Sequence, residues 1–226
     1  MTKYFSDRWA LILGASSGFG AASAKRLAEA GMNIAGVHLD RKSTMDNVTA
    51  LQADLRGYGV KEVFFNINAA DADKRGEVIN QLRELAPGKI GVVMHSLAFG
   101  TLRPFINEDK KEAMQKAQMD MTIDVMANSL VYWAQDLLEA KLFAKGSQVY
   151  AMTSAGSSRV WKSYGAVSAA KCALESHCRQ LALELAPHGV AVNAILAGVT
   201  DTPALRKIPG NEIMIETATS ETLWAV

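Results

Sequence analysis

The chain has 226 residues, enough for one sizeable domain with its own hydrophobic core. Hydrophobic residues make up 49% of it and charged residues 21%, and its net charge of +1 arises from both signs scattered along the chain. This balance excludes the basic surface expected of a nucleic-acid-binding protein or of one that binds anionic membranes. No apolar run is long enough for a membrane span or a signal-peptide core, so we expect a cytoplasmic protein.

Short apolar runs alternate with helical patterns along the whole chain. The predicted strands are 9–13, 33–39, 62–68, 90–95, 147–152 and 191–196, and the predicted helices are 19–30, 44–57, 71–85, 108–143 with a break near Gln118, and 164–186. Fully apolar strands separated by helices predict an α/β fold, a doubly wound (Rossmann) parallel sheet with helices on both faces. No linker divides the chain, so residues 1–226 are predicted to form a single domain.

The two cysteines, Cys172 and Cys178, lie six residues apart in the last predicted helix. This spacing places them on different faces of the helix, which is unsuitable for a disulfide or for a pair of metal ligands. We therefore expect no metal site and a reducing compartment.

A glycine-rich loop joins the first predicted strand to the first predicted helix, with the sequence Gly14-Ala15-Ser16-Ser17-Gly18-Phe19-Gly20. Its glycines permit a tight turn and let a pyrophosphate approach backbone N–H groups at the positive end of the helix. The hydroxyls of Ser16 and Ser17 are additional candidate donors. In its strand–turn–helix setting the loop predicts dinucleotide binding, whereas the glycines alone would be consistent with a plain tight turn.

The second predicted strand ends at His38-Leu39-Asp40-Arg41-Lys42. An acidic residue here would accept a hydrogen bond from the adenosine ribose and favour NAD, whereas a basic residue would favour the 2′-phosphate of NADP. Asp40 and Arg41 are adjacent, so the choice stays open, and the basic residues also fit a solvated loop. Asn68 and Ala69, at the end of the third strand, fall where such folds usually contact adenine.

Several further motifs follow in a fixed order: HSLAFG at 95–100, TSAGSS at 153–158, Tyr164 with Lys171, and VNAILAG at 192–198. Together with the glycine loop they resemble the short-chain dehydrogenase/reductase superfamily over residues 8–203. The Tyr-x6-Lys spacing and the HS-x-AF motif are similar to the divergent branch that contains the bacterial enoyl-acyl-carrier-protein reductases. The standard branch instead has Tyr-x3-Lys.

The resemblance implies a role for each matching position. The glycine loop would bind the cofactor pyrophosphate, and Lys171 would bind the nicotinamide ribose. Tyr164 would face the substrate carbonyl, with Ser154 as a further candidate catalytic residue. The residues implied to bind NAD(P)H are Gly14, Ser16, Ser17, Gly18, Phe19, Gly20, Asp40, Arg41, Asn68, Ala69, Ser96, Leu97, Ala98, Lys171, Ala197, Gly198, Val199, Thr200 and Thr202.

The chain departs from the family pattern at several positions. Ser154 stands where many enoyl reductases of this branch have a second tyrosine, and Val199 stands where many relatives have proline. Asp124 lies nearest to the position of the standard branch's catalytic asparagine. Residues 203–226 match a substrate-covering segment, and the helix and seventh strand that usually follow are expected to be absent.

The long Tyr–Lys gap suggests a particular reaction. Residues seven apart on a helix share a face and differ by roughly 10 Å along its axis, about two turns. In enoyl-thioester reduction, hydride goes to the β-carbon while negative charge develops on the thioester oxygen two carbons away. A displaced Tyr164 hydroxyl could stabilise that oxygen, and a nearby Lys171 ammonium would keep the site electropositive.

The expected function is NAD(P)H-dependent reduction of the C=C bond of an enoyl thioester in fatty-acid synthesis. The substrate would be an acyl thioester, on acyl carrier protein or coenzyme A, and relatives usually assemble as dimers or tetramers. Two alternatives stay open. One is another oxidoreductase of this fold, acting on a ketone, alcohol or dienoyl thioester, and the other is a non-catalytic nucleotide sensor.

Overall fold

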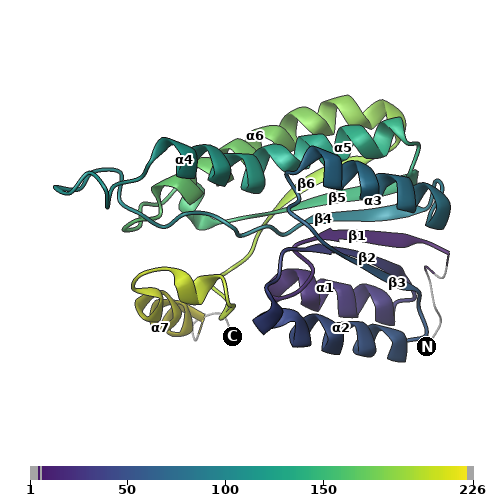
Figure 1. The fold of residues 1–226 in the computed structure, drawn as a ribbon, viewed down its shortest axis with the longest axis horizontal. Coiled ribbons are helices and arrows are strands. Elements are labelled where there is room, and N and C mark those ends of the chain that lie inside the picture. The colour runs from purple at the N-terminus through teal and green to yellow at the C-terminus, as the bar shows by residue number, and fades with distance from the viewer. Residues whose placement is uncertain (1–4, 6, 223–226) are drawn as a thin grey trace.

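The computed structural model describes residue 5 and residues 7–222. In this part of the chain, six parallel strands form one sheet in the order β3-β2-β1-β4-β5-β6 (Figure 1). The strands are β1 (Trp9–Leu13), β2 (Asn33–His38), β3 (Glu62–Asn66), β4 (Ile90–His95), β5 (Phe143–Thr153) and β6 (Ala191–Leu196). This order is that of a doubly wound sheet, which confirms the predicted fold class. The direction in which the chain adds strands to the sheet reverses between β1 and β4, and doubly wound folds bind their ligands at this point.

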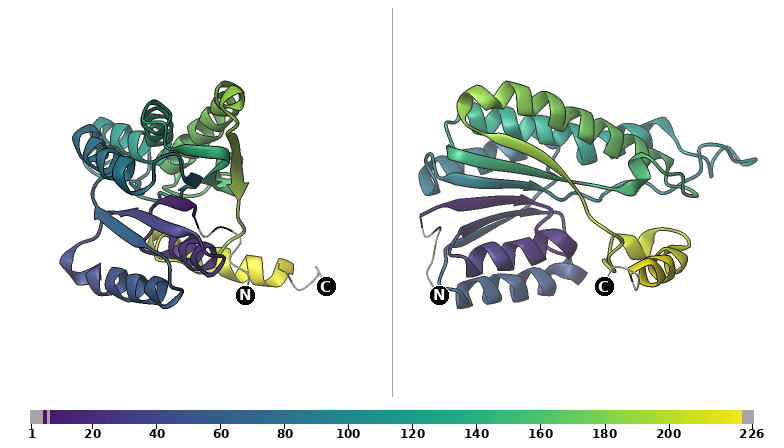
Figure 2. Two further views of the ribbon diagram at one scale, coloured as in Figure 1. Left: turned by 90° about the vertical axis from the view of Figure 1, so that its right-hand side faces the viewer. Right: turned by 180° about the vertical axis from the view of Figure 1, so that it is seen from behind.

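Helices cover both faces of the sheet (Figures 1 and 2). They are α1 (Gly18–Glu29), α2 (Met45–Gly57), α3 (Ala72–Leu85), α4 (Lys116–Ile123), a π-helical turn (Asp124–Asn128), α5 (Ser129–Glu139), α6 (Gly165–Leu185) and α7 (Asn211–Thr222). The helices α1 and α2 lie on one face, and α3 to α6 lie on the other. The helix α7 lies apart from both layers, beyond the strand ends.

Successive side chains of β1 point alternately into two separate parts of the hydrophobic core. Leu11 and Leu13 pack in the cluster formed with α3, α5 and α6, whereas Ala10 and Ile12 pack in the cluster formed with α1 and α2. Because successive side chains of a strand point to opposite faces, a strand covered on both sides must be apolar at every position. All five residues of β1 are buried accordingly.

The predicted helix 108–143 is wrong at both ends. Residues 96–115 are irregular, and the helix begins only at Lys116, where Gln115 and Gln118 form a reciprocal capping box. Upstream, Asn107 and Asp109 bond to nearby backbone N–H groups, which competes with helix formation. At the other end α5 stops at Glu139, and residue 143 already belongs to β5.

The expected break near Gln118 is also wrong, since the irregularity is the π turn at Asp124–Asn128. A π turn is a single i→i+5 turn inside a helix that continues on both sides, so no helix-stop signal in the sequence marks it.

The last strand, β6, forms an edge of the sheet and is exposed at five of its six residues. No seventh strand occurs among residues 7–222, in agreement with the sequence expectation. Residues 223–226 of the predicted substrate-covering segment lie outside the described part of the chain. None of the described helices combines the length and apolarity needed to cross a bilayer.

Candidate active site

Parallel pairing brings the ends of three strands to one place at the edge of the sheet. Leu13 of β1 is in register with His95 of β4, and His95 is in register with Ala151 of β5. The glycine loop, the segment after β4 and the end of β5 therefore leave the sheet side by side. Motifs that lie up to about 140 residues apart in the sequence meet at this edge.

The glycine loop fits the backbone-lined cradle that a pyrophosphate requires. Gly14 has a φ of +88°, and a Cβ there would lie 2.4 Å from the carbonyl oxygen of Ser96. A Cβ on Gly20 would lie 2.0 Å from the carbonyl oxygen of Gly14. Ser17 is the N-cap residue of α1 but makes no capping hydrogen bond with its side chain, so the first N–H groups of the helix keep their capacity for an anion.

We expect Gly20→Ala to weaken NAD(P)H binding, because its Cβ forces the Gly14 carbonyl and the loop to move. Overpacking of this kind typically costs about 1–3 kcal/mol of stability. Cofactor titration by fluorescence and thermal denaturation measure the two effects. Gly76→Ala in α3 is the matched control, since a Cβ there meets nothing within 4 Å. Unchanged cofactor affinity in Gly20→Ala would contradict the assignment of the loop.

Asp40 lies at the predicted adenosine end of the site and is held in place from several sides. Its side chain bonds to Nδ1 of His38 at 3.0 Å, and its backbone N–H and C=O both bond to the side chain of Asn66. Burial alone would raise the pKa of the Asp40 carboxyl, but hydrogen bonds from Thr44, Ser16 and His38 outweigh it and lower the pKa. The group is therefore an ionised acceptor beside the glycine loop.

The other residues predicted to contact the adenosine differ in their solvent exposure. Arg41 is exposed after β2, and Asn68 is exposed after β3. Ala69 is 4% exposed, and its carbonyl accepts a hydrogen bond from the indole of Trp133. The backbone carbonyl of Ala69 is thus used for a hydrogen bond within the hydrophobic core.

The structure brings Tyr164 and Ser154 together. The Tyr164 hydroxyl lies 3.3 Å from Ser154 Oγ, and Tyr164 is the N-cap residue of α6. The ring lies against Gly156, where a Cβ would come within 2.4 Å of it. Ser163, just before the tyrosine, has a φ of +60°, a backbone conformation that is costly for a non-glycine residue and is concentrated at functional sites.

Lys171 lies two turns further along α6 and is only 5% exposed. Its ammonium group donates to the carbonyl of Met152 at 2.7 Å and to that of Leu97 at 3.3 Å. Burial lowers the pKa of Lys171 to about 8, while the charge of Glu175 acts in the opposite direction. Glu175 is itself fixed by a 2.5 Å hydrogen bond from Thr153 at the end of β5.

The remaining predicted cofactor residues border the same edge. Ser96 and Leu97 are partly buried against Gly14, and Ala98 is exposed. Past β6, residues 197–202 run across toward the glycine loop, and Thr202 lies near Gly18, with its Cγ2 3.4 Å from a Cβ placed there. Gly198, Val199 and Thr200 are exposed.

Sequence reasoning missed several supporting residues, notably Asn66, Ser129, Thr153 and Glu175. Each acts through a hydrogen bond to another element, which the sequence does not show, although Thr153 is the first residue of the TSAGSS motif. Strand-end position was a usable signal for Asn66 and Thr153, because the ends of neighbouring parallel strands meet at one edge.

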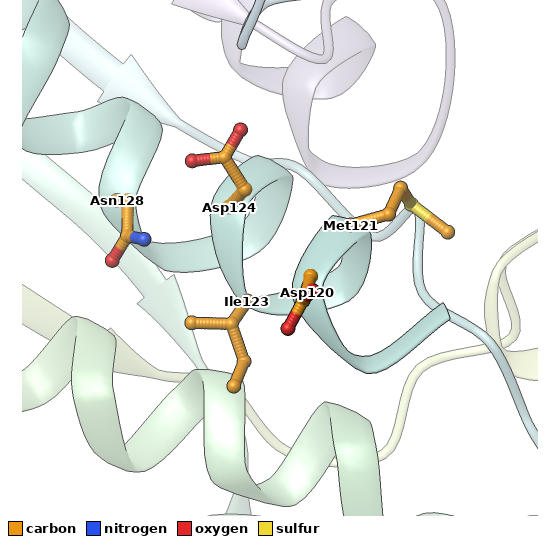
Figure 3. Close-up of a pocket in the computed structure, with 5 residues that line it drawn as sticks. All are labelled: Asp120, Met121, Ile123, Asp124 and Asn128. Carbon is orange, nitrogen blue, oxygen red and sulfur yellow. The ribbon is translucent and has the colours of Figure 1, made fainter. Parts of the chain in front are cut away.

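A shallow hollow of about 380 Å³ lies elsewhere, on α4 and the π turn (Figure 3). It is lined by Asp120, Met121, Ile123, Asp124 and Asn128 and does not include Tyr164 or Lys171. Asp124 accepts a hydrogen bond from the Tyr132 hydroxyl at 3.0 Å.

A family model described as "Enoyl-(Acyl carrier protein) reductase" matches residues 14–224. The chain therefore belongs to this family of short-chain dehydrogenases/reductases, as the motifs implied.

Similarity to individual proteins spans several activities. The chain is 32% identical over 152 residues to the NADPH enoyl-acyl-carrier-protein reductase FabI of Staphylococcus aureus strain MRSA252, covering 65% of this chain and 57% of that protein. It is 24% identical over 209 residues to the cyclohexanol dehydrogenase of Rhodococcus sp. strain TK6, covering 88% of this chain and 76% of that protein. A short-chain dehydrogenase of Burkholderia cenocepacia J2315, solved in complex with NADP, superposes with a TM-score of 0.76 at 25% identity, covering 88% and 77% of the two chains. The chain thus spans little more than half the length of the Staphylococcus aureus enoyl reductase, and the named activities of its relatives differ.

Proposed function

We propose that this protein reduces the C=C bond of an enoyl thioester with NAD(P)H. The observation that carries the proposal is the arrangement of Tyr164, Ser154 and Lys171 at the edge where β4 and β5 end. The cofactor is NAD(P)H, and the cradle at Gly14 and Gly20 has the shape that its pyrophosphate needs. The 32% identity to the Staphylococcus aureus enoyl reductase supports the same substrate class.

The side chains of Tyr164, Ser154 and Lys171 can stabilise the negative charge that develops in this reaction. When bound, the cofactor supplies a hydride for the β-carbon of the substrate. Negative charge then develops on the thioester oxygen, where the Tyr164 hydroxyl donates a hydrogen bond and stabilises the enolate. Addition of a proton from water to the α-carbon completes the reduction. The Ser154 hydroxyl, 3.3 Å from Tyr164, is positioned to hold the tyrosine or to donate to the same oxygen. The positive charge of Lys171 favours every negative charge that forms nearby.

Apolar side chains beside Tyr164 suit an acyl substrate. The ring of Phe105 lies against Gly165, the residue after the tyrosine, and remains 50% exposed. Phe99, in the segment after β4, is 53% exposed. The exposed ring of Phe105 next to the candidate catalytic tyrosine supports a surface that an apolar ligand covers.

Cofactor oxidation on a crotonyl thioester, compared with an acetoacetyl thioester, tests the proposal. We expect turnover of the enoyl compound to exceed that of the keto compound. Turnover of the keto compound alone would reject the enoyl assignment and favour the alternative of a ketone or alcohol substrate, which the similarity to cyclohexanol dehydrogenase supports. Cofactor binding without any turnover would favour a nucleotide sensor.

The carrier of the acyl group and the assembly of the protein are part of the proposal. We propose an acyl-carrier-protein thioester as the substrate and a homo-oligomer formed through α4, α5 and α6. Size-exclusion chromatography with light scattering measures the assembly. Comparing acyl-carrier-protein and coenzyme A thioesters of the same acyl group measures the carrier preference.

Asp40 is proposed to favour NADH over NADPH, because an ionised carboxylate at this position repels a 2′-phosphate. We expect Asp40→Asn to raise the ratio of kcat/KM for NADPH to that for NADH by about tenfold, equivalent to about 1.4 kcal/mol. Steady-state kinetics with both cofactors measures this ratio. The control Arg41→Gln should move it in the opposite direction. A ratio unaffected by Asp40→Asn would remove Asp40 from cofactor selection.

A further inference from the structure

His95 is a fully buried histidine at the carboxyl end of β4 with a defined hydrogen-bonding role. It is 0% exposed, and its Nε2 lies 2.9 Å from Ser129 Oγ. The Ser129 hydroxyl donates its single hydrogen to the carbonyl of Val125 at 2.7 Å. The proton between His95 and Ser129 must therefore belong to Nε2, which makes the histidine the donor.

The neutral form of His95 is the stable one. Burial, and then the positive charge of Lys171, lower the pKa of His95 to about 3. Its Nδ1 has no hydrogen-bond partner within the described part of the chain. A neutral imidazole of this kind is a fixed donor across the physiological pH range and does not act as a proton acceptor at neutral pH.

The hydrogen bonds of Ser129 connect the sheet to the π turn Asp124–Asn128 (Figure 3 shows this turn). The backbone N–H of Ser129 bonds to the carbonyl of Asp124, five residues earlier, while its hydroxyl bonds to Val125 within the turn. Isolated π turns in α-helices are rare and concentrate at functional sites. His95 is thus anchored to the irregular part of the helix.

Tyr164 packs against a cluster that includes a residue of the π turn. Met126, at 1% exposure, forms a small apolar cluster with Val167 and Ala170 of α6, and Tyr164 and Leu102 pack against this cluster. Protein interiors are close-packed, so a shift of the Met126 backbone displaces the side chains that rest on it. A contiguous path of contacts leads from His95 through Ser129 and the turn to Tyr164.

We propose that His95 is a positioning residue: through Ser129 it fixes the π turn, and thereby the Met126 cluster on which Tyr164 rests. This inference rests on the proposed function in taking Tyr164 as the catalytic hydroxyl. It gives the histidine of the HSLAFG motif a role that does not require proton transfer.

Steady-state kinetics of four variants and one control variant tests the inference. We expect His95→Leu to lower kcat on the crotonyl thioester by about 10- to 100-fold, because a misplacement of about 1 Å can cost 100-fold, while KM for NAD(P)H stays unchanged. Ser129→Ala should lower kcat similarly, and the double variant should be no worse than either single variant, since both break one path. His95→Gln, whose amide can donate to Ser129, should recover most of the loss. The exposed His188→Gln is the control.

Several results would overturn the inference. They are additive losses in the double variant, a His95→Gln variant as slow as His95→Leu, or a change confined to KM for the cofactor. If His95→Leu does not fold, Ser129→Ala still decides whether the link matters.

Hydrogen exchange of the substrate-free protein separates this inference from the proposed function. We expect amides of residues 124–130 to exchange about tenfold faster in His95→Leu and Ser129→Ala, with those of α3 unchanged. If the wild-type protein fails to reduce the crotonyl thioester, the proposed function fails, while the exchange measurement still tests the link. Unaltered exchange at the turn in a folded His95→Leu protein would refute the link itself.

Discussion

Tyr164→Phe is expected to lower kcat on a crotonyl thioester by about 100- to 1,000-fold, the usual cost of removing one donor to a developing oxyanion. The ring can keep its packing against Gly156 and the Met126 cluster, so the fold should be retained. The variant loses only the hydroxyl and its 3.3 Å hydrogen bond to Ser154. Cofactor oxidation followed by absorbance measures the rate, and fluorescence titration measures NAD(P)H binding, which should stay unchanged.

Tyr150→Phe is the matched control for this prediction. Tyr150 lies within β5, the strand that leads to Ser154, and not in the loop beyond the carboxyl end of that strand. Its loss of a hydroxyl should leave kcat at the wild-type value. A Tyr164→Phe protein that retains wild-type kcat would show that the hydroxyl takes no part in the reaction.

Lys171→Met is expected to reduce kcat/KM by at least about 100-fold, because it removes both the proposed ribose ligand and the positive charge near the developing oxyanion. In the wild-type protein, burial lowers the pKa of Lys171 to about 8, so the ammonium is lost above that pH. The kcat/KM of the wild-type protein should therefore fall as the pH rises through about 8. A pH profile of kcat/KM measures this pKa in the free enzyme.

The same substitution should change the pH dependence of stability. The folded protein releases the Lys171 proton at about pH 8, whereas the unfolded chain holds it up to about 10.5. Between these values the unfolded state binds more protons, so the contribution of Lys171 to stability rises with pH. From pH 7 to 11 the wild-type free energy of unfolding should gain on the order of 3 kcal/mol relative to Lys171→Met.

Urea denaturation of the cofactor-free proteins at several pH values measures that difference. Lys162→Met, which removes an exposed lysine near the same site, should run parallel to the wild type at all pH values. Parallel curves for Lys171→Met as well would mean that Lys171 titrates in the folded protein as it does in the unfolded chain.

Sequence reasoning succeeded where local pattern and physical constraint coincide. The strands β1 and β4 were predicted with their observed bounds, because strands buried on both faces must be apolar throughout. The glycine loop was recognisable because close backbone approach admits no side chain at Gly14 or Gly20. The order of these elements along the chain then fixed the doubly wound fold class.

The region between β4 and β5 resisted prediction for an equally physical reason. Its charged residues have good intrinsic helix propensity, yet local bonds from Asn107 and Asp109 hold the backbone in turns. The π turn was not predicted because its contacts include the hydrogen bond between His95 and Ser129, and His95 belongs to a strand more than thirty residues away.

The sequence by itself therefore determined the class of fold and the family, since both follow from the order of strands, helices and motifs along the chain, and it marked the glycine loop by its spacing. Only the tertiary structure decided that Tyr164 meets Ser154, that Lys171 is buried on the carbonyls of Leu97 and Met152, and that His95 is hydrogen-bonded to Ser129. Parallel strands are joined by long crossovers, so residues that share a strand edge are far apart in the chain. Their distances, burial and pKa values exist only once the sheet has formed.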